Sequence, residues 1–267
     1  MTHQLLINHK TVYDYDAAVP YSLLQLRLMP MDRPGQQIKD WYLDIEGGKI
    51  QVQYKDHNDN HLALVSLNPG TEQVVITCQG AVNVQDIQGV IGRHSGPSQL
   101  WLFKRHTRYT EAGRHCKALA DRAQGDVGSL SWLHDLSAIV RSAITYEIGA
   151  TNAYWRAEDA AKSGHGVCQD HAHIFIACCR LKGIAARYVS GYLLMDDRTH
   201  QNASHAWAEA HVDGLGWVGF DISNGISPDH RYVCLATGLD YGEAAPVSGL
   251  RYGQAQEKLA VHLSVQQ

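Results

Sequence analysis

The sequence predicts an α+β protein with an N-terminal antiparallel β domain, followed by a domain in which a cysteine-bearing helix packs on an antiparallel sheet. Before the glycine- and serine-rich stretch 89–99, polar and apolar residues alternate in short runs, which is typical of strands. After it, several segments carry apolar residues at helical spacing. A length of 267 residues suits two domains. We therefore divide the chain into domains 1–98 and 99–267.

The first domain is expected to form an antiparallel sandwich or half-barrel. Turn signals such as "RPG", "DHNDN" and "NPG" separate its alternating runs. In "DIEGGKIQV" two such runs flank Gly47 and Gly48, and glycine reaches positive φ at little cost, so we predict a β-hairpin there. The strands are expected within "TVYDYD", "LLQLRLMP", "WYLDIEGGKIQVQYKD", "HLALVSL" and "EQVVITCQGAVNVQD".

The second domain is expected to begin with helices and to end in strands. Apolar residues recur at helical spacing in "EAGRHCKALADRA" and "GSLSWLHDLSAIVRSAITYEI". A third helix is predicted over "CQDHAHIFIACCRLK", because Gly183 follows it as a natural C-terminal cap. The runs "IAARYVSGYLL", "HAWAEAHV" and "WVGFD" are then predicted as strands.

Composition excludes several classes of function. The formal net charge is −4, so the chain lacks the basic surface that tracks a phosphate backbone, and we expect no nucleic acid partner. No run of about 18 apolar residues is present, and no signal peptide is evident at the N-terminus. The six cysteines form no small disulfide framework. We expect a reducing, cytoplasmic setting and no membrane partner.

The stretch "GHGVCQDHAHIF" places one cysteine and three histidines within nine positions. His165, Cys168, His171 and His173 are all possible zinc ligands. If the helix starts near Cys168, however, His173 lies five positions on, about 140° round the helix from Cys168 at 3.6 residues per turn. The four groups then do not converge on one ion. We therefore expect no metal and no cofactor, and keep a zinc-binding protein as an alternative.

Cys168 has the setting of a nucleophile. Gly164 and Gly166 lie in the turn that leads into its helix. The unpaired N–H groups and positive dipole end of a helix N-terminus favour a thiolate, and the same N–H groups can stabilise an oxyanion. Cys168 taken alone would more simply be a small buried apolar residue. Whether Cys168 is a nucleophile or a buried apolar residue therefore depends on whether the chain supplies a partner histidine.

The segment "ASHAWAEAHVDGLGWVGFDISNG" supplies a base and a carboxylate on neighbouring strands. His205 begins an alternating strand that also turns Trp207 and Glu209 to one face, with Ala206, Ala208 and Ala210 on the other. Small residues on that second face would let a helix pack closely. The returning strand ends in Asp221.

At these residues the sequence resembles a known family. "GVCQDHAHIFIACCRLKGIAARYVSGYL", "HAWAEAHVDGLGWVGFDISNG" and "GLDYGEAAPVSG" are similar to the catalytic domain of the bacterial transglutaminase-like superfamily, a papain-like Cys-His-Asp group often described as cysteine proteases. "INHKTVYDYDAAVPYSLLQLRLMPMDRPGQQI" resembles the β domain that precedes it. The resemblance implies Cys168 as nucleophile, His205 as base and Asp221 as third member.

Three departures from the family pattern leave these residues in place. Ala185 stands where the family usually has proline, and Leu239 where it has arginine. Ile222 and Ser223 replace the proline and threonine that usually follow the aspartate. Glu209, on the His205 face, is the alternative carboxylate.

The strand pair that carries His205 and Asp221 poses a problem of register. A regular hairpin centred on Gly214–Leu215 pairs Asp221 with Ala208, three residues from His205, and an odd offset puts the two side chains on opposite faces. We therefore predict a bulge, an asymmetric turn or an early strand end between Ala206 and Asp221.

These residues predict a thiol-dependent amide or peptide bond hydrolase or acyl transferase. Cys168 attacks a carbonyl, its backbone N–H helps to hold the oxyanion, and a thioester acyl-enzyme results. Hydrolysis of a peptide or protein amide is favoured, because water is always present. Transamidation by a protein-glutamine transglutaminase is an alternative, and so is a non-catalytic binding domain that retains the fold.

Overall fold

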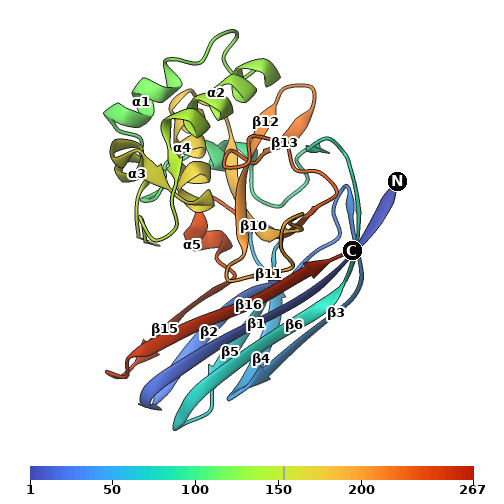
Figure 1. Ribbon diagram of the computed structural model, residues 1–267, viewed down its shortest axis with the longest axis vertical. Helices are drawn as coiled ribbons and strands as arrows, with labels where there is room; N and C mark the ends of the chain where they lie inside the picture. Colours follow the sequence, from blue (N-terminus) through green and yellow to red (C-terminus); the bar gives the residue numbers. More distant parts are fainter. Residues whose placement is uncertain (153) are drawn as a thin grey trace.

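The computed structural model describes residues 1–152 and 154–267 and confirms the α+β class. Three antiparallel sheets form the framework, and the helices gather on one of them (Figure 1). The two long sheets of the β region lie at the opposite end of the molecule from helices α1 to α4 (Figure 1). The bounds of the helices are α1 (Arg114–Ala120), α2 (Leu130–Ala143), α3 (Ala157–Ser163), α4 (Cys168–Leu181) and α5 (Tyr241–Ala244).

The β region consists of two sheets whose facing sides form one apolar core. Alternate residues of the strands point inward, so Leu5, Leu26 and Ile76 are fully buried. The five-stranded sheet has the order β11 (His200–Gln201), β16 (Glu257–Gln266), β1 (Thr2–Val19), β6 (Thr71–Gln85) and β3 (Gln36–Glu46). The four-stranded sheet has the order β15 (Val247–Tyr252), β2 (Tyr21–Met29), β5 (His61–Leu67) and β4 (Gly48–Lys55).

The predicted hairpin at Gly47 and Gly48 is wrong. β3 pairs with β6 and β4 pairs with β5, so the chain leaves one sheet at this turn and enters the other. Gly47 has a φ of +79°, and a Cβ there would collide with the carbonyl oxygen of Gln73. Alternation identifies a strand with one buried face, but it does not identify the strand with which it pairs. Here the glycine lies in a turn that connects two different sheets.

The third sheet carries the segments that were predicted to hold the site. Its central strands confirm the three predicted strands, and β7 lies within the stretch 89–99 that we had placed at the domain boundary. The order is β14 (Tyr232–Gly238), β10 (Ala186–Leu193), β12 (His205–Val212), β13 (Gly216–Phe220) and β7 (Val90–Gly92). A short parallel pair, β8 (Thr145–Tyr146) and β9 (His165–Gly166), completes the strands.

Helix α4 packs closely on the third sheet, as the small residues of β12 predict. Ala206, Ala208 and Ala210 are buried and share one core with the apolar side of α4. The helix begins at Cys168 and is followed by Gly183, whose φ is +76°. The thiol therefore lies at the helix N-terminus, as expected.

Strand pairing crosses the expected division at residue 98 in both directions. β7 joins the third sheet, while β15 and β16 pair with β2 and β1. In Figure 1 the C-terminal strand β16 lies beside β1. Tyr192 of β10 projects into the core of the β region and its hydroxyl lies 2.7 Å from Nδ1 of His9. The two parts therefore share packing. Among the described residues, no helix is both long and apolar enough to cross a membrane.

Candidate active site

The approach to Cys168 is shaped by Asp170 and Gly166. The Asp170 carboxylate accepts a hydrogen bond from the Val167 N–H at 2.9 Å and another from the Thr151 hydroxyl at 2.7 Å. A Cβ on Gly166 would come within 2.6 Å of the Asp170 side chain. Glycine therefore lets the chain pass close to this carboxylate, which caps the helix at the residue before Cys168.

His205 and Asp221 form a buried pair. His205 Nε2 lies 2.7 Å from Asp221 Oδ2, and both side chains are removed from solvent. Burial of the ring opposes protonation, but the hydrogen bond with Asp221 and the neighbouring Cys168 thiol together raise the pKa of His205 to about 10. Because Asp221 occupies Nε2, the nitrogen left for the thiol is Nδ1. The three residues thus lie in the order Cys168, His205, Asp221.

The Asp221 carboxylate is held by further donors besides His205. The Tyr232 hydroxyl and the Asn224 side-chain amide each donate to Oδ2 at 2.7 Å, and the Ser223 hydroxyl donates to Oδ1 at 2.8 Å. Burial opposes ionisation of Asp221, but His205, Tyr232 and Asn224 hold its pKa well below the usual range. Ser223 keeps a hydroxyl at the position where the family usually has threonine.

The register prediction is confirmed. β12 and β13 pair Val212 with Gly216 and Ala208 with Phe220, so the turn holds three residues instead of two. This shift by one residue puts Asp221 on the same face as His205. Strand β13 also ends at Phe220, and Asp221 forms an isolated bridge with Ile226. Both an asymmetric turn and an early strand end are present.

The alternative carboxylate, Glu209, has other partners. Its two oxygens accept hydrogen bonds from Arg33 at 2.6 Å and from Arg187 at 2.7 Å. Arg33 comes from the loop before β3, so this buried cluster joins the β region to the third sheet. Glu209 therefore compensates two guanidinium groups and does not orient His205.

The histidines next to Cys168 each contact different groups. His165 Nδ1 pairs with Glu147 at 2.7 Å, and His173 Nε2 accepts the Tyr241 N–H at 3.1 Å. The ring nitrogens of His171 face backbone carbonyl oxygens. In the part of the chain that is described, no group of three or more His, Cys, Asp or Glu side chains is arranged to hold a metal ion.

Two residues of the site were missed by the sequence analysis. Asn224 follows Asp221 by three positions, and an asparagine so close to a strand end is a local signal for a turn that caps the carboxylate. Tyr232 lies on β14 and has no local signal, because only the folding of the sheet brings it to Asp221. In the loop before α3, the side-chain oxygen of Asn152 accepts a hydrogen bond from the Tyr154 N–H at 2.9 Å.

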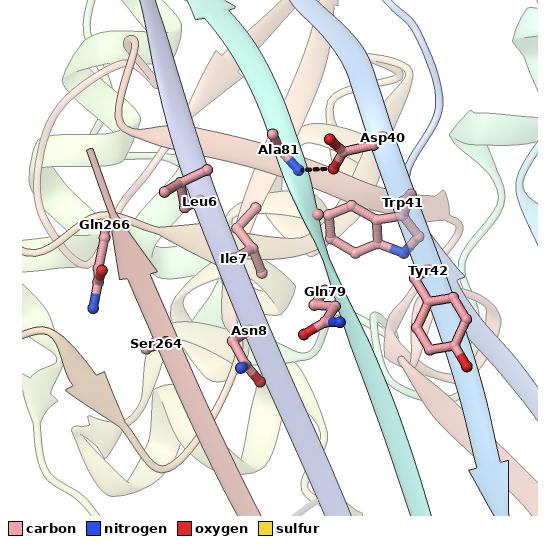
Figure 2. A pocket seen from close by; sticks show the side chains of 11 residues that line it. Leu6, Ile7, Asn8, Asp40, Trp41, Tyr42, Gln79, Ala81, Ser264 and Gln266 are labelled. Atoms are coloured by element: carbon pink, nitrogen blue, oxygen red, sulfur yellow. Dashed lines mark hydrogen bonds between the residues drawn. The ribbon is translucent and has the colours of Figure 1, made fainter.

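A separate hollow lies away from the triad. It has a volume of about 580 Å³ and is open to one side. Figure 2 shows it on the five-stranded sheet, with Leu6 and Asn8 on β1, Gln79 on β6 and Tyr42 on β3. None of its lining residues belongs to the third sheet or to α4, so the hollow is not part of the candidate active site.

The fold and this arrangement of side chains define a protein of transglutaminase-like architecture. Residues 117–222 match the model of the transglutaminase-like superfamily, and residues 5–83 match that of the bacterial transglutaminase-like N-terminal region. The chain therefore belongs to the transglutaminase-like superfamily. The matched core includes Cys168, His205 and Asp221.

Similar proteins match either nearly the whole chain or about half of it. An uncharacterized protein of Mycobacterium leprae is 24% identical over 98% of each chain. An uncharacterized protein of Mycobacterium tuberculosis is 33% identical over 48% of this chain and 44% of its own. A crystal structure from Cytophaga hutchinsonii, named a candidate cysteine protease, matches 100% of this chain and 92% of its own with a TM-score of 0.79 at 21% identity. At that identity the last likeness shows the fold alone.

Proposed function

We propose that the protein cleaves an amide or peptide bond through a thioester acyl-enzyme formed on Cys168. The observation that carries this proposal is the buried His205–Asp221 pair at 2.7 Å, coupled to a thiol at a helix N-terminus. A histidine held by a carboxylate and acting on a thiol is the arrangement that activates a cysteine nucleophile.

The three residues of the triad have different tasks in the reaction. The Cys168 thiolate attacks the carbonyl carbon, and the backbone N–H of Cys168 stabilises the oxyanion. As the C–N bond breaks, the His205 imidazolium gives its proton to the leaving amine. Asp221 fixes the ring orientation and stabilises the imidazolium. Water activated by His205 then attacks the thioester, which releases the acid and restores the thiol.

Hydrolysis and transamidation share every step up to the thioester. An amine acceptor in place of water would give transamidation, and hydrolysis is favoured here because water needs no binding site of its own. Incubating a glutamine-containing peptide with and without a primary amine separates the two. Release of the acid in both cases supports hydrolysis, whereas amine incorporation at the expense of acid supports transamidation.

The nucleophile is tested with p-nitrophenyl acetate, which needs no knowledge of the natural substrate. We expect an acetyl group on Cys168 by peptide mass mapping, and turnover that is lost in Cys168→Ala. Cys178→Ala is the matched control, because Cys178 lies on the same helix and is fully buried in the core. Full esterase turnover by Cys168→Ala would remove Cys168 from the mechanism.

The third member is tested by comparing two carboxylates. Asp221→Asn is expected to lower turnover by about 10³–10⁴-fold while the fold survives. Glu209→Gln leaves two buried guanidinium groups without their anion, so we expect a loss of about 3–5 kcal/mol of stability and turnover that persists in the folded fraction. Loss of turnover in folded Glu209→Gln, with retention in Asp221→Asn, would reverse the assignment.

The remaining properties are part of the same proposal. The substrate is a peptide or protein amide, no nucleic acid or membrane takes part, and no metal or cofactor is needed. The six cysteines are free thiols, which supports a reducing, cytoplasmic setting.

A further inference from the structure

His171 lies one helical turn after Cys168 and has an unusual pair of partners. The side chain is buried, with 1% of its surface exposed. Its Nδ1 lies 2.9 Å from the carbonyl oxygen of Val167, and its Nε2 lies 3.2 Å from the carbonyl oxygen of Ile144. A carbonyl oxygen only accepts hydrogen bonds, so each ring nitrogen faces a group that needs a donor.

A neutral imidazole has one N–H and one bare nitrogen. In the neutral form, one nitrogen of His171 would direct its lone pair at a carbonyl oxygen in a buried site, which is unfavourable. Only the imidazolium donates to both carbonyls. Its partners are therefore matched to a doubly protonated ring.

Two other buried histidines, His9 and His173, have different partners. His9 faces two hydroxyl groups, those of Tyr192 and Thr11, which can donate as well as accept. His173 accepts the Tyr241 N–H at Nε2. Burial lowers the pKa of His9 to about 4 and that of His173 to about 3. Both of these rings are neutral, and they are internal references for His171.

Charged and polar groups of α4 and β8 surround His171. Asp170 is its neighbour on α4; burial raises the pKa of that carboxyl, while the hydrogen bonds from Thr151 and from the Val167 N–H act to lower it. The Tyr146 ring of β8 lies 6.1 Å from the His171 ring. Cys168 is three positions earlier on the same helix. The positive end of the helix dipole disfavours the cation, but an anion and two carbonyl oxygens offset it.

The carbonyl that Nδ1 contacts belongs to the peptide unit that contains the Cys168 N–H. In a trans peptide the C=O and N–H point in opposite directions, so a hydrogen bond to one end fixes the direction of the other. The Val167 oxygen also accepts the backbone N–H of His171 at 3.1 Å. Donation to this oxygen polarises the peptide and strengthens the Cys168 N–H as a donor.

We propose that His171 is a positioning residue held as an imidazolium, which bridges the carbonyls of Val167 and Ile144, orients the Cys168 N–H toward the oxyanion and favours the Cys168 thiolate. This inference rests on the proposed function and deepens it. His171 touches no reacting atom and acts through the peptide unit of the nucleophile.

The protonation state is tested directly on the wild-type protein. In ¹⁵N-resolved NMR of the histidine side chains at pH 7.5, both nitrogens of His171 are expected in the protonated range, while His9 and His173 each show one bare nitrogen. A bare nitrogen on His171 at this pH would overturn the proposal. This measurement needs no substrate, so it separates the role of His171 from the question of whether the protein turns over an amide.

The consequence for the nucleophile is tested with His171→Phe and His171→Gln. The rate at which iodoacetamide alkylates Cys168 is measured from pH 5 to pH 10, with circular dichroism as the check on folding. His171→Phe keeps the ring shape without its protons, and we expect the midpoint of the alkylation profile to move to higher pH. We also expect esterase kcat to fall roughly tenfold, short of the 10²–10³-fold seen when an oxyanion donor is removed outright. His171→Gln keeps an N–H donor. Its alkylation midpoint and its kcat should therefore lie between those of the wild type and those of His171→Phe.

An alkylation profile and a kcat in folded His171→Phe that equal those of the wild type would overturn the proposal, whatever the substrate proves to be. If neither variant folds, the NMR result on the wild-type protein decides alone. Absence of turnover in the wild type, together with a doubly protonated His171, would count against the proposed function and leave the charge assignment intact.

Discussion

At the scale of single residues, burial separates Cys168 from the other five cysteines. Cys168 is partly exposed at the start of α4, whereas Cys78, Cys116, Cys178, Cys179 and Cys234 are buried. Burial raises the pKa of Cys78 to about 12 and raises that of Cys234 above its ordinary value. The protein therefore carries one accessible thiol at a helix N-terminus among thiols that packing keeps inert.

We expect iodoacetamide to label Cys168 first. The reason is that Cys168 is partly exposed at a helix N-terminus, whereas the other five cysteines are buried. Alkylation at sub-saturating reagent followed by peptide mapping checks the order. Labelling of Cys116 or Cys234 ahead of Cys168 in folded protein would contradict the assignment of the nucleophile.

The His205–Asp221 pair predicts a pH dependence of stability. The pKa of His205 rises from 6.5 to about 10 on folding, so its contribution is complete below pH 6.5 and is lost as the pH rises toward 10. The Asp221 contribution is present above pH 4 and is lost on acidification, because the pKa of Asp221 is depressed.

Urea unfolding at pH 6.5 and at pH 10 should therefore differ by on the order of 3 kcal/mol in the free energy of unfolding. Asp221→Asn is the matched comparison, since it removes the anion that holds the proton on His205. Its stability should fall much less over this range. An equal fall in wild type and Asp221→Asn would show that other groups govern the alkaline transition.

At the scale of elements, the three-residue turn between β12 and β13 decides whether a triad exists. Gly214 and Gly216 both have positive φ, +83° and +85°. A Cβ on Gly214 would meet nothing within 4 Å, whereas one on Gly216 would collide with the backbone of Gly92 in β7. The two glycines thus share a positive φ and differ in their surroundings.

This difference predicts unequal effects of two alanine substitutions. Gly214→Ala should cost only the unfavourable backbone conformation, about 1–2 kcal/mol. Gly216→Ala adds the collision with Gly92, so we expect a loss of about 2–4 kcal/mol and a lower esterase kcat. Urea denaturation and turnover of the two variants measure this. Equal stability of the two variants would mean that the turn does not depend on its contact with β7.

At the scale of the whole molecule, the end of the chain completes the β region. β16 pairs with β1 along its length, and β15 pairs with β2. Leu263 and Val265 of β16 are buried in the core of that region. The last segment therefore stabilises sheets whose other strands come mainly from the first 85 residues.

Removal of residues 246–267 should destabilise the β region severely. It would expose the edge strands β1 and β2 and the apolar side chains that β16 covers. Thermal unfolding by circular dichroism is expected to show a large fall in Tm or a loss of the cooperative transition. Deletion of Gln267 alone, which is exposed, is the control and should leave Tm unchanged. A truncated chain with the wild-type Tm would show that β15 and β16 are dispensable.

Much of the site could be predicted from local sequence. The helix from Cys168 to Gly183, the alternating strand from His205 and the carboxylate at the end of the next strand depend on periods of 3.6 and 2, which neighbouring residues along the chain determine. A regular two-residue hairpin would have put His205 and Asp221 on opposite faces, so the sequence also predicted an irregular turn. The turn between β12 and β13 is irregular.

The tertiary structure alone decided which distant segments meet. Alternation marks the buried face of a strand but not its partner, so it misassigned the turn at Gly47 and did not reveal that β15 and β16 return to β2 and β1. Local sequence also did not reveal single long-range contacts, such as those of Tyr232 with Asp221 and of Arg33 with Glu209. Local patterns record which side of an element is buried, whereas partner choice depends on packing between residues far apart in the chain.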